Sequence, residues 1–335
     1  MSYIEMKHIV KNYGATSVLK GIDLEIEKGE LVTLLGPSGC GKSTLLRCLA
    51  GLEEVTDGQI FLDGQEITTL EPRKREIGMV FQQYSLFPNM TVTQNVAFGM
   101  KLKKKPEAEI REKVKNILEI VGLSQQADRY PTQISGGQQQ RAALARAIIT
   151  EPKVLLLDEP LSAIDALLRR SLQNEIRRIQ QELNITAVFV THDQSEAMVM
   201  SDMIHLLYQG QIEQSAPPAE MYLHPKTRFA ASFIGNYNIY TDVQFHQMTG
   251  LKLDREMLVF RPEAVMFCDP DRTEMNSYTM KGTIKSEIAH GNVLRYTVDV
   301  NGVPVNVDTL FQGEERYEKG QECYLKIAEK DCISY

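Results

Sequence analysis

The sequence lacks tryptophan, a cysteine framework and any apolar run long enough to cross a bilayer. Its five cysteines in 335 residues are odd in number and form no C-x-x-C pair. This pattern disfavours a disulfide framework or a zinc site and fits a reducing cytosol. No segment approaches the ~18 consecutive apolar residues of a spanning helix, and residues 1–14 hold no apolar core of signal-peptide length. If the chain works at a membrane, we expect it to do so through a partner.

An excess of positive charge is also missing. The chain holds 37 Lys and Arg against 44 Asp and Glu, a net charge of −7. Because nucleic-acid binders usually carry a basic excess, no nucleic-acid partner is expected. The rest of the composition, 43% hydrophobic and 24% charged, is that of an ordinary globular chain, and its length allows two domains.

The apolar segments predict an α/β domain over residues 1–235. Leu31–Leu35, Val154–Leu157 and Ala187–Val190 are continuous apolar runs, and the segment Ala166–Leu183 between the last two is expected to be helical. Such runs are typical of a parallel sheet whose two faces are both covered. We therefore expect an α/β fold built on a parallel sheet. The glycine-rich loop described below makes this fold one of the phosphate-loop (P-loop) type.

Two other regions have a different pattern of apolar and turn residues. Within residues 84–150, a helical subdomain is predicted from helical apolar spacing in Pro106–Val121 and from high helix propensity in Gln138–Thr150. After residue 235 the chain consists of short strand candidates, such as Val293–Val300, with glycine-containing turns between them. Residues 236–335 are therefore predicted to form a small all-β domain of sandwich or barrel type.

A phosphate-binding loop follows the expected strand Leu31–Leu35. Residues 36–44 fit the pattern G-x-x-x-x-G-K-[ST] in its required strand context. Glycines let the backbone wrap around phosphates and aim N–H groups at them from a helix N-terminus. Lys42 would then bind the β- and γ-phosphates of ATP, and the Ser43 hydroxyl would ligate Mg²⁺; the alternative is an ordinary glycine-rich turn before a helix. The loop comprises Gly36, Pro37, Ser38, Gly39, Cys40, Gly41, Lys42, Ser43 and Thr44.

Two acids stand at the end of the apolar run Val154–Leu157. Because the carboxyl ends of parallel strands form the ligand crevice, Asp158 could hold the Mg²⁺ shell. Glu159, one residue on, could polarise the attacking water as a general base. Two acids after a strand can also simply cap a following helix.

Ser135, Gly136, Gly137 and Gln138 form a third motif, at the start of the helix expected up to Thr150. A serine and two glycines expose backbone N–H groups at a helix start, which makes an anion site. The alternative is a plain N-cap followed by flexible glycines.

The three motifs, in this order, resemble those of the ABC transporter ATPases, and the resemblance is close over residues 1–235. It implies an ATPase in which Ser135–Gln138 is the signature that touches the γ-phosphate held by a second copy of the chain. Two copies would then sandwich two ATP molecules, with Mg²⁺ at each site. Ile134, before the signature, and Ile164 stand where leucine is usual in this family.

The resemblance assigns roles to four other residues, each with a simpler alternative. Gln82 matches the glutamine that reaches Mg²⁺ or the attacking water, unless it is only solvated at a strand end. His192 matches the switch histidine on the γ-phosphate, unless it is structural. Asp165 belongs to the loop that crosses the dimer interface in the family, and Tyr13 matches the residue whose ring stacks on adenine, unless it only packs on its strand.

The resemblance also implies partners and a cellular place. Tyr84–Asn95 resembles the segment that grips a transmembrane permease subunit, with Leu86, Phe87 and Met90 forming an apolar groove for a partner helix. Packing within the helical subdomain is the alternative, and both can hold. Two permease subunits and, indirectly, an extracytoplasmic solute-binding protein would place the chain at the cytoplasmic face of the membrane.

Residues 236–335 resemble the accessory OB-like (TOBE) domain of importer ATPases that handle sugars, polyamines, iron or anions. Its compact size favours ferric iron, polyamines or phosphonates as the solute over sugars. Other classes remain open: ABC ATPases acting on DNA or on ribosomes, and a catalytically silent structural subunit. Only 90 residues separate Thr44 from Ser135, without heptads or cysteine clusters, which argues against the DNA-acting class.

Overall fold

A computed structural model describes residues 2–82, 85–162, 164, 166–269, 276–311 and 317–335. Its contacts divide the chain into two compact units, Met1–Met221 and Tyr222–Tyr335. The division lies before the boundary expected at residue 235, because Ala231 packs against Tyr237 and Val259. Each unit is described by itself.

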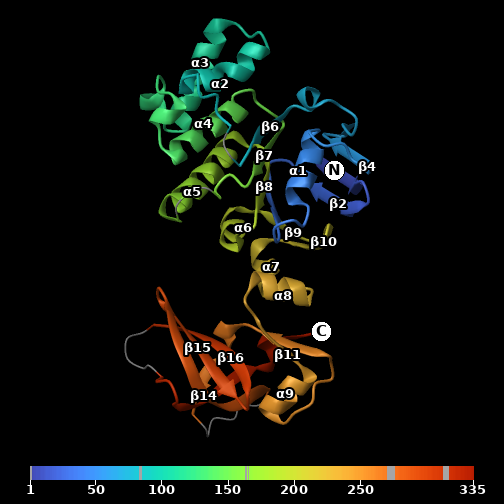
Figure 1. Ribbon diagram of the computed structural model, residues 1–335, viewed down its shortest axis with the longest axis vertical. Coiled ribbons are helices and arrows are strands. Elements are labelled where there is room, and N and C mark those ends of the chain that lie inside the picture. Colours follow the sequence, from blue (N-terminus) through green and yellow to red (C-terminus); the bar gives the residue numbers. More distant parts are fainter. Residues whose placement is uncertain (1, 83–84, 163, 165, 270–275, 312–316) are drawn as a thin grey trace. The chain divides into compact units, whose positions relative to one another are not determined.

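A six-stranded, mostly parallel sheet forms the centre of the first unit (Figure 1), in the order β10-β9-β3-β8-β7-β6. Only β10 runs antiparallel, against β9. The interior strands β3, β7 and β8 are buried along their whole length, as the continuous apolar runs predict. The strands are β3 (Leu31–Leu35), β6 (Ile77–Val80), β7 (Val154–Asp158), β8 (Thr186–Thr191), β9 (Met203–Tyr208) and β10 (Gln211–Ala216).

The first unit also contains an antiparallel sheet. Two of its strands come before β3 in the sequence, and the other two lie between β3 and β6. Its order is β2-β1-β4-β5, and Ile60 and Leu62, two residues apart on β4, are buried, as expected for a strand with one covered face. The strands are β1 (Ile4–Tyr13), β2 (Thr16–Ile26), β4 (Asp57–Leu62) and β5 (Gln65–Glu66).

The helices of the first unit alternate with the strands of the parallel sheet. None of the helices in the described part of the chain is long and apolar enough to span a bilayer. The α-helices are α1 (Lys42–Ala50), α2 (Val92–Leu102), α3 (Glu107–Ile120), α4 (Gly136–Ile148), α5 (Ala166–Leu183), α6 (Gln194–Met200) and α7 (Pro218–Leu223), and the 3₁₀ helices are η1 (Pro72–Lys74), η2 (Ser124–Gln126) and η3 (Pro131–Gln133).

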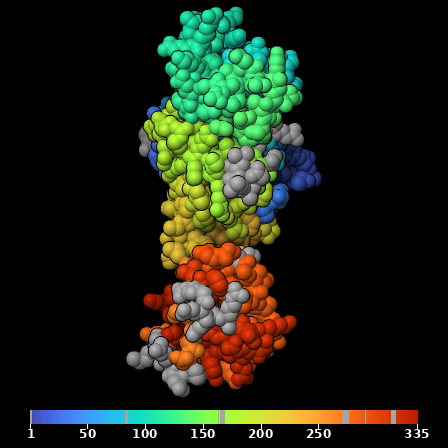
Figure 2. All heavy atoms as spheres, turned by 90° about the vertical axis from the view of Figure 1, so that its left-hand side faces the viewer, coloured from blue at the N-terminus to red at the C-terminus, as the bar shows by residue number. Residues whose placement is uncertain are grey.

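The two faces of the parallel sheet are covered by different layers. On β7, Leu155 and Leu157 belong to one core with α2, α3, α4 and α5, whereas Val154 and Leu156 belong to a second core with α1 and the antiparallel sheet. Figure 2 shows the first layer from outside, as the cyan to yellow-green surface of this unit. The helices α1 and α4 therefore lie on opposite faces of the same sheet.

The second unit is built on two antiparallel sheets, with strand orders β11-β12-β18 and β13-β17-β14-β15-β16. It also contains two helices that the sequence analysis did not anticipate. The elements are α8 (Arg228–Ile234), β11 (Asn238–Thr241), α9 (Asp242–Thr249), β12 (Met257–Phe260), η4 (Pro262–Ala264), β13 (Met266–Cys268), β14 (Ser277–His290), β15 (Val293–Val300), β16 (Val303–Leu310), β17 (Glu322–Ala328), η5 (Glu329–Asp331) and β18 (Cys332–Ser334).

Candidate active site

In the phosphate-loop motif Gly36–Thr44, residues 36–41 join β3 to α1, and Lys42, Ser43 and Thr44 form the first turn of the helix. Gly36 has φ +152° and Gly41 has φ +106°, conformations that residues with a Cβ rarely adopt. A Cβ on Gly36 would lie 2.2 Å from the Leu207 carbonyl oxygen, so the neighbouring strand also requires glycine there. The helix α1 begins at Gly41 with no side-chain cap, which leaves the N–H groups of its first turn for an anion.

The Lys42 side chain is folded into this loop. It is buried, and its ammonium donates hydrogen bonds to the carbonyl oxygens of Gly36 at 2.7 Å and Pro37 at 2.8 Å. The Cys40 sulfur lies 3.9 Å from the same ammonium, and burial raises the pKa of the Cys40 thiol. Lys42 is thus held at the point where bound phosphates would approach the loop.

Ser43 and Asp158 meet where α1 faces the end of β7. The Ser43 hydroxyl donates to the Asp158 carboxylate at 2.7 Å, and the Arg47 guanidinium lies 3.8 Å from the other carboxylate oxygen. A hydroxyl and a carboxylate are the hard oxygen ligands that Mg²⁺ accepts. No cluster of three or more His, Cys, Asp or Glu residues able to hold a metal occurs in the described segments. This donor set fits Mg²⁺ bound through few protein ligands together with phosphates and water.

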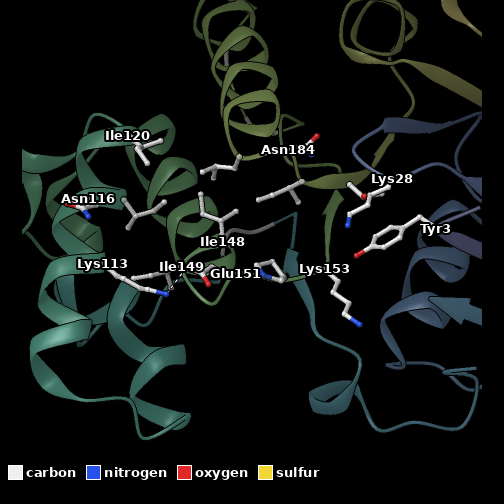
Figure 3. Close-up of a pocket in the computed structure, with 15 residues that line it drawn as sticks. Tyr3, Lys28, Lys113, Asn116, Ile120, Ile148, Ile149, Glu151, Lys153 and Asn184 are labelled. Atoms are coloured by element: carbon white, nitrogen blue, oxygen red, sulfur yellow. Dashed lines mark hydrogen bonds and ion pairs between the residues drawn. The ribbon is translucent and has the colours of Figure 1, made fainter. Parts of the chain in front are cut away.

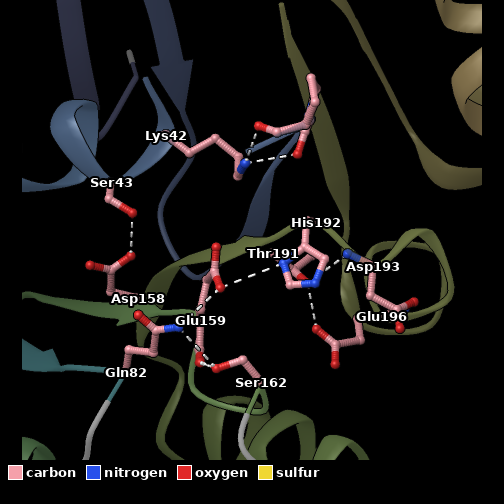
Figure 4. Close-up of polar contacts among 12 residues, drawn as sticks. Lys42, Ser43, Gln82, Asp158, Glu159, Ser162, Thr191, His192, Asp193 and Glu196 are labelled. Atoms are coloured by element: carbon pink, nitrogen blue, oxygen red, sulfur yellow. Dashed lines mark hydrogen bonds and ion pairs between the residues drawn. The ribbon is translucent and has the colours of Figure 1, made fainter. Parts of the chain in front are cut away.

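Glu159 follows Asp158 and lies among the other expected site residues (Figure 4). The Gln82 amide donates to Oε2 of Glu159 at 3.4 Å, and Nδ1 of His192 lies 3.5 Å from the same oxygen. Glu159 has φ +45°, a left-handed conformation that costs a non-glycine residue some free energy. The ends of β6, β7 and β8 therefore bring Gln82, Glu159 and His192 together.

Ser162 connects two of these residues, a role that the sequence analysis did not assign. Its hydroxyl donates to the Glu159 carbonyl oxygen at 3.0 Å and lies 3.3 Å from the Gln82 amide nitrogen. A hollow of about 40 Å³ beside it is lined by Glu159 and His192, among others. A hollow of this size can hold a water molecule next to the carboxylate.

A polar network of side chains next to His192 was not predicted from the sequence. The Thr191 hydroxyl donates to the buried Glu196 carboxylate, and the Asp193 N–H donates to the Thr191 oxygen at 3.0 Å. Arg169 lies 3.4 Å from Asp193 and 3.8 Å from Glu196. Burial raises the pKa of Glu196, and the network holds the backbone on both sides of His192.

Ser135 and Gln138 form a capping box at the N-terminus of α4. Ser135 is the N-cap of α4; its hydroxyl accepts from the Gln138 N–H at 3.4 Å, and the Gln138 amide oxygen accepts from the Ser135 N–H at 2.9 Å. The N-cap alternative is thus present, while Gly136 and Gly137 hold N–H groups that helix geometry leaves without intrahelical partners. No hydrogen bond or ion pair among the described residues joins this segment to Gly36–Thr44.

The other positions discussed in the sequence analysis have different outcomes. Tyr13 ends β1 with its ring 46% exposed, and the Lys11 ammonium lies 4.7 Å from the ring centroid. Asp165 lies outside the described residues, as does Tyr84 at the start of the expected permease contact. Ile134 and Ile164, the two departures from the usual leucine, are both buried in the core that includes α4.

The described part of the expected permease contact is fixed by Asn95. Its buried amide accepts from the Phe87 N–H at 2.8 Å and donates to the carbonyl oxygens of Phe87, Met90 and Thr91. The Phe87 ring packs on Phe98, with centroids 4.6 Å apart. The alternative of internal packing thus holds for Phe87, although its side chain is only half-buried.

The strand β3, the phosphate loop and the helix α1, together with two carboxylates at the end of β7, define a P-loop nucleoside triphosphatase. Known proteins narrow this class. The ABC transporter family matches residues 19–162. A "Fe(3+) ions import ATP-binding protein FbpC 1" of Pectobacterium atrosepticum is 53% identical over 71% of this chain and 68% of its own length.

Other relatives match over more of the chain. The "Spermidine/putrescine import ATP-binding protein PotA" of Haemophilus influenzae (strain KW20) is 43% identical over 93% of this chain and 90% of its own. The solved structure of cbiO1 from Clostridium perfringens, part of the ABC transporter complex cbiONQ, is 33% identical with a TM-score of 0.62 over 65% of this chain and 90% of that one. The chain belongs to the ATP-binding proteins of the ABC transporter family. It is an ATPase and the energy-coupling subunit of an importer.

Proposed function

We propose that two copies of this chain hydrolyse two ATP molecules between them, at the cytoplasmic face of a membrane, and so drive solute uptake through two permease subunits. The observation that carries this proposal is the meeting of Gln82 and His192 at the Glu159 carboxylate, within 3.4 and 3.5 Å. A carboxylate held between an amide and an imidazole, beside a water-sized hollow, is suited to activate a water.

Each of the site residues has a role in the transfer of the γ-phosphoryl group of ATP to water. Lys42 leaves the loop carbonyls and donates to the phosphate oxygens, together with the N–H groups that begin α1. Mg²⁺, held by Ser43 and Asp158, would neutralise charge on the phosphates. Glu159 accepts a proton as the water oxygen forms a bond to the γ-phosphorus; the bond to the bridging oxygen breaks, and ADP leaves with that electron pair. Gln82 and His192 orient the water and the γ-phosphate.

The second copy is required because the signature and the phosphate loop belong to different layers. Gly36–Thr44 leads into α1 on one face of the sheet, and Ser135–Gln138 begins α4 on the other. The signature N–H groups would therefore serve the ATP on the partner, with Gly136 and Gly137 beside its γ-phosphate and Asp165 at the interface. We expect turnover per chain to rise with protein concentration; a value independent of concentration down to the nanomolar range would contradict a dimeric site.

Replacement of Glu159 tests the role of the base. Glu159→Gln keeps the size of the side chain and its contacts with Gln82 and His192, so ATP binding should survive. Turnover should fall by about 10²–10⁴-fold, the usual contribution of a general base. Glu182→Gln, on the exposed surface of α5, is the matched control. Phosphate release by Glu159→Gln at the parental rate would exclude Glu159 as the base.

For the solute we propose a polyamine first and ferric iron second. The matches to spermidine/putrescine import proteins extend over 88% and 93% of this chain and so include most of the second unit, whereas matches to Fe(3+) import proteins cover 71% and 78%. Uptake of labelled putrescine and of labelled ferric iron, in cells that express this chain with its permease, would decide. Loss of putrescine uptake in cells expressing Glu159→Gln supports the proposal; loss of iron uptake alone overturns the order.

A further inference from the structure

A hollow of about 500 Å³ lies at the edge of the parallel sheet opposite to the ATP site (Figure 3). Pro152 and Lys153, which precede β7, and Asn184 and Ile185, which precede β8, line it. The site residues Asp158 and Glu159 stand at the other end of β7, about 16 Å away for five residues of strand. The volume is that of a small-molecule site.

The wall of the hollow is apolar and comes from several helices. Isoleucines on α3 and at the end of α4 face Leu183 at the end of α5. Of these, Ile117 and Ile148 are buried members of the core, whereas Leu183 is 37% exposed. An apolar ligand can therefore enter between fixed walls without opening the core.

Lysines stand at the rim, and two of them are already paired. Lys113 binds Glu151 at 2.5 Å, and Lys153 lies 3.4 Å from both Asp63 and Glu76. The three lysines and the carboxylates of Glu151, Asp63 and Glu76 together carry no net charge. In the described segments, Lys28 is the one of these three lysines whose ammonium has no carboxylate within 4.0 Å.

Lys28 is placed by bonds in its own loop. The next residue, Gly29, donates its N–H to the Thr186 hydroxyl at 2.9 Å and accepts from the Gln180 amide at 2.8 Å. The Lys28 ammonium lies 5.3 Å from the centroid of the Tyr3 ring. In Figure 3 the Tyr3 hydroxyl points into the hollow beside this ammonium. Burial, and then the Asp63 carboxylate, raise the pKa of the Tyr3 phenol, so it remains a donor at neutral pH.

We propose that this hollow binds a medium-chain fatty acid, whose carboxylate lies on Lys28 and Tyr3 and whose chain packs on the isoleucines of α3 and α4. The Lys28 ammonium and the Tyr3 phenol are two donors that match the acceptor oxygens of a single carboxylate. Apolar walls match a flexible alkyl chain, and each added methylene that is buried should tighten binding about fourfold.

The ligand would act on ATP turnover through α4. This helix begins at the signature and ends at Ile148 in the wall of the hollow, so its two ends are about 20 Å apart. The start of β8 and the helix α3 border the same space, and a ligand there contacts both the sheet and the helical layer. The effect on turnover rests on the role proposed for Ser135–Gln138, whereas binding does not.

Binding is measured first, by calorimetry on the full chain without nucleotide, with decanoate as the probe. Decanoate should bind about fifteenfold more tightly than octanoate, and decylamine, with the same chain and the opposite charge, should not bind. Lys28→Gln should weaken decanoate binding by about tenfold or more, and Tyr3→Phe by about threefold, since it keeps the ring but removes one donor to a charged group. Lys252→Gln, an exposed lysine of the second unit, is the charge control.

The outcomes separate the proposal from a nonspecific interaction. Absence of decanoate binding, equal binding of decylamine, or unchanged affinity in Lys28→Gln would overturn the site. In a second measurement, decanoate at saturation should change ATP turnover of the parental chain and not that of Lys28→Gln. Unchanged turnover with decanoate bound would overturn the coupling through α4. Failure of the dimer proposal is detected separately, by turnover that is independent of protein concentration without decanoate.

Discussion

Two helices of this chain begin with glycine-rich segments, and they begin differently. The helix α1 starts at Gly41 in a left-handed conformation with no side-chain cap, while α4 starts at Ser135 with a complete capping box. A Cβ on Gly41 would lie 2.7 Å from the Leu19 side chain, whereas a Cβ on Gly136 would meet nothing within 4 Å. The first helix start is enclosed by its own chain, and the second is open.

The difference indicates what each helix start is built to bind. The α1 start provides Lys42 and uncapped N–H groups within one fold, so it can bind phosphates by itself. The α4 start satisfies part of its own hydrogen bonding and presents an open glycine surface, so it is stable without a ligand and accessible to another molecule. The four variants below test this contrast, from the largest effect to the smallest.

Loss of the Lys42 ammonium should have the largest effect. Lys42→Ala removes the only side-chain cation of the loop, and turnover should fall by about 10²–10³-fold or more, as for removal of a donor to the transition state. ATP affinity should fall too, measured by fluorescence of a labelled nucleotide. Lys115→Ala, an exposed lysine of α3, should leave both unchanged. Near-parental ATP turnover of Lys42→Ala would contradict the role of the α1 N-terminus in binding the phosphates of ATP.

Addition of one methyl group at each helix start should separate them. Gly41→Ala adds a Cβ at φ +106° against Leu19 and should lose both stability, by about 1–3 kcal/mol, and ATP binding. Gly136→Ala adds a Cβ in open space and should keep stability or raise it by about 0.4–1 kcal/mol. Its turnover should nevertheless fall, because the methyl lies where the partner's phosphate would approach. Equal thermal unfolding temperatures of the two variants would contradict the difference between the enclosed N-terminus of α1 and the open N-terminus of α4.

Removal of the serine cap should have a smaller effect on stability than the Gly41→Ala change. Ser135→Ala should destabilise the first unit by about 1 kcal/mol, measured by denaturant unfolding. Thr91→Ala is a matched control, because Thr91 and Gln94 form the same capping box at α2. Both variants should lose similar stability, but only Ser135→Ala should lose turnover. If Thr91→Ala lost as much turnover, the cap rather than the signature would explain the effect.

Much of the first unit follows from the sequence, because its signals are local. The continuous apolar run Leu31–Leu35 predicted β3 with its observed bounds, and the segment Ala166–Leu183, expected to be helical between two such runs, is α5. Glycine spacing predicted the phosphate loop. The two unforeseen helices of the second unit had signals as well. Thr241 and Gln244 form a capping box, and Gly250 ends α9 in a left-handed conformation, which is the usual start and stop of a helix.

Other features depend on contacts between distant segments. The bond of Thr191 to Glu196 and the position of Lys28 beside Tyr3 have no sequence pattern, since Tyr3 and Lys28 belong to different strand ends. The position of Arg47 could be predicted in part. Arg47 lies four residues after Ser43, so helical spacing places both residues on one face of α1. Their common contact with Asp158 depends on the fold.

A mixture of two inactive chains tests the central claim most directly. Lys42→Ala lacks the phosphate contact of its own loop, and Ser135→Arg blocks the signature with a bulky side chain. If each signature serves the other chain, half of the dimers in an equal mixture are mixed, and each has one intact composite site. The account predicts that ATP turnover returns to about a quarter of the parental value on mixing. A mixture as inactive as its two components would contradict it.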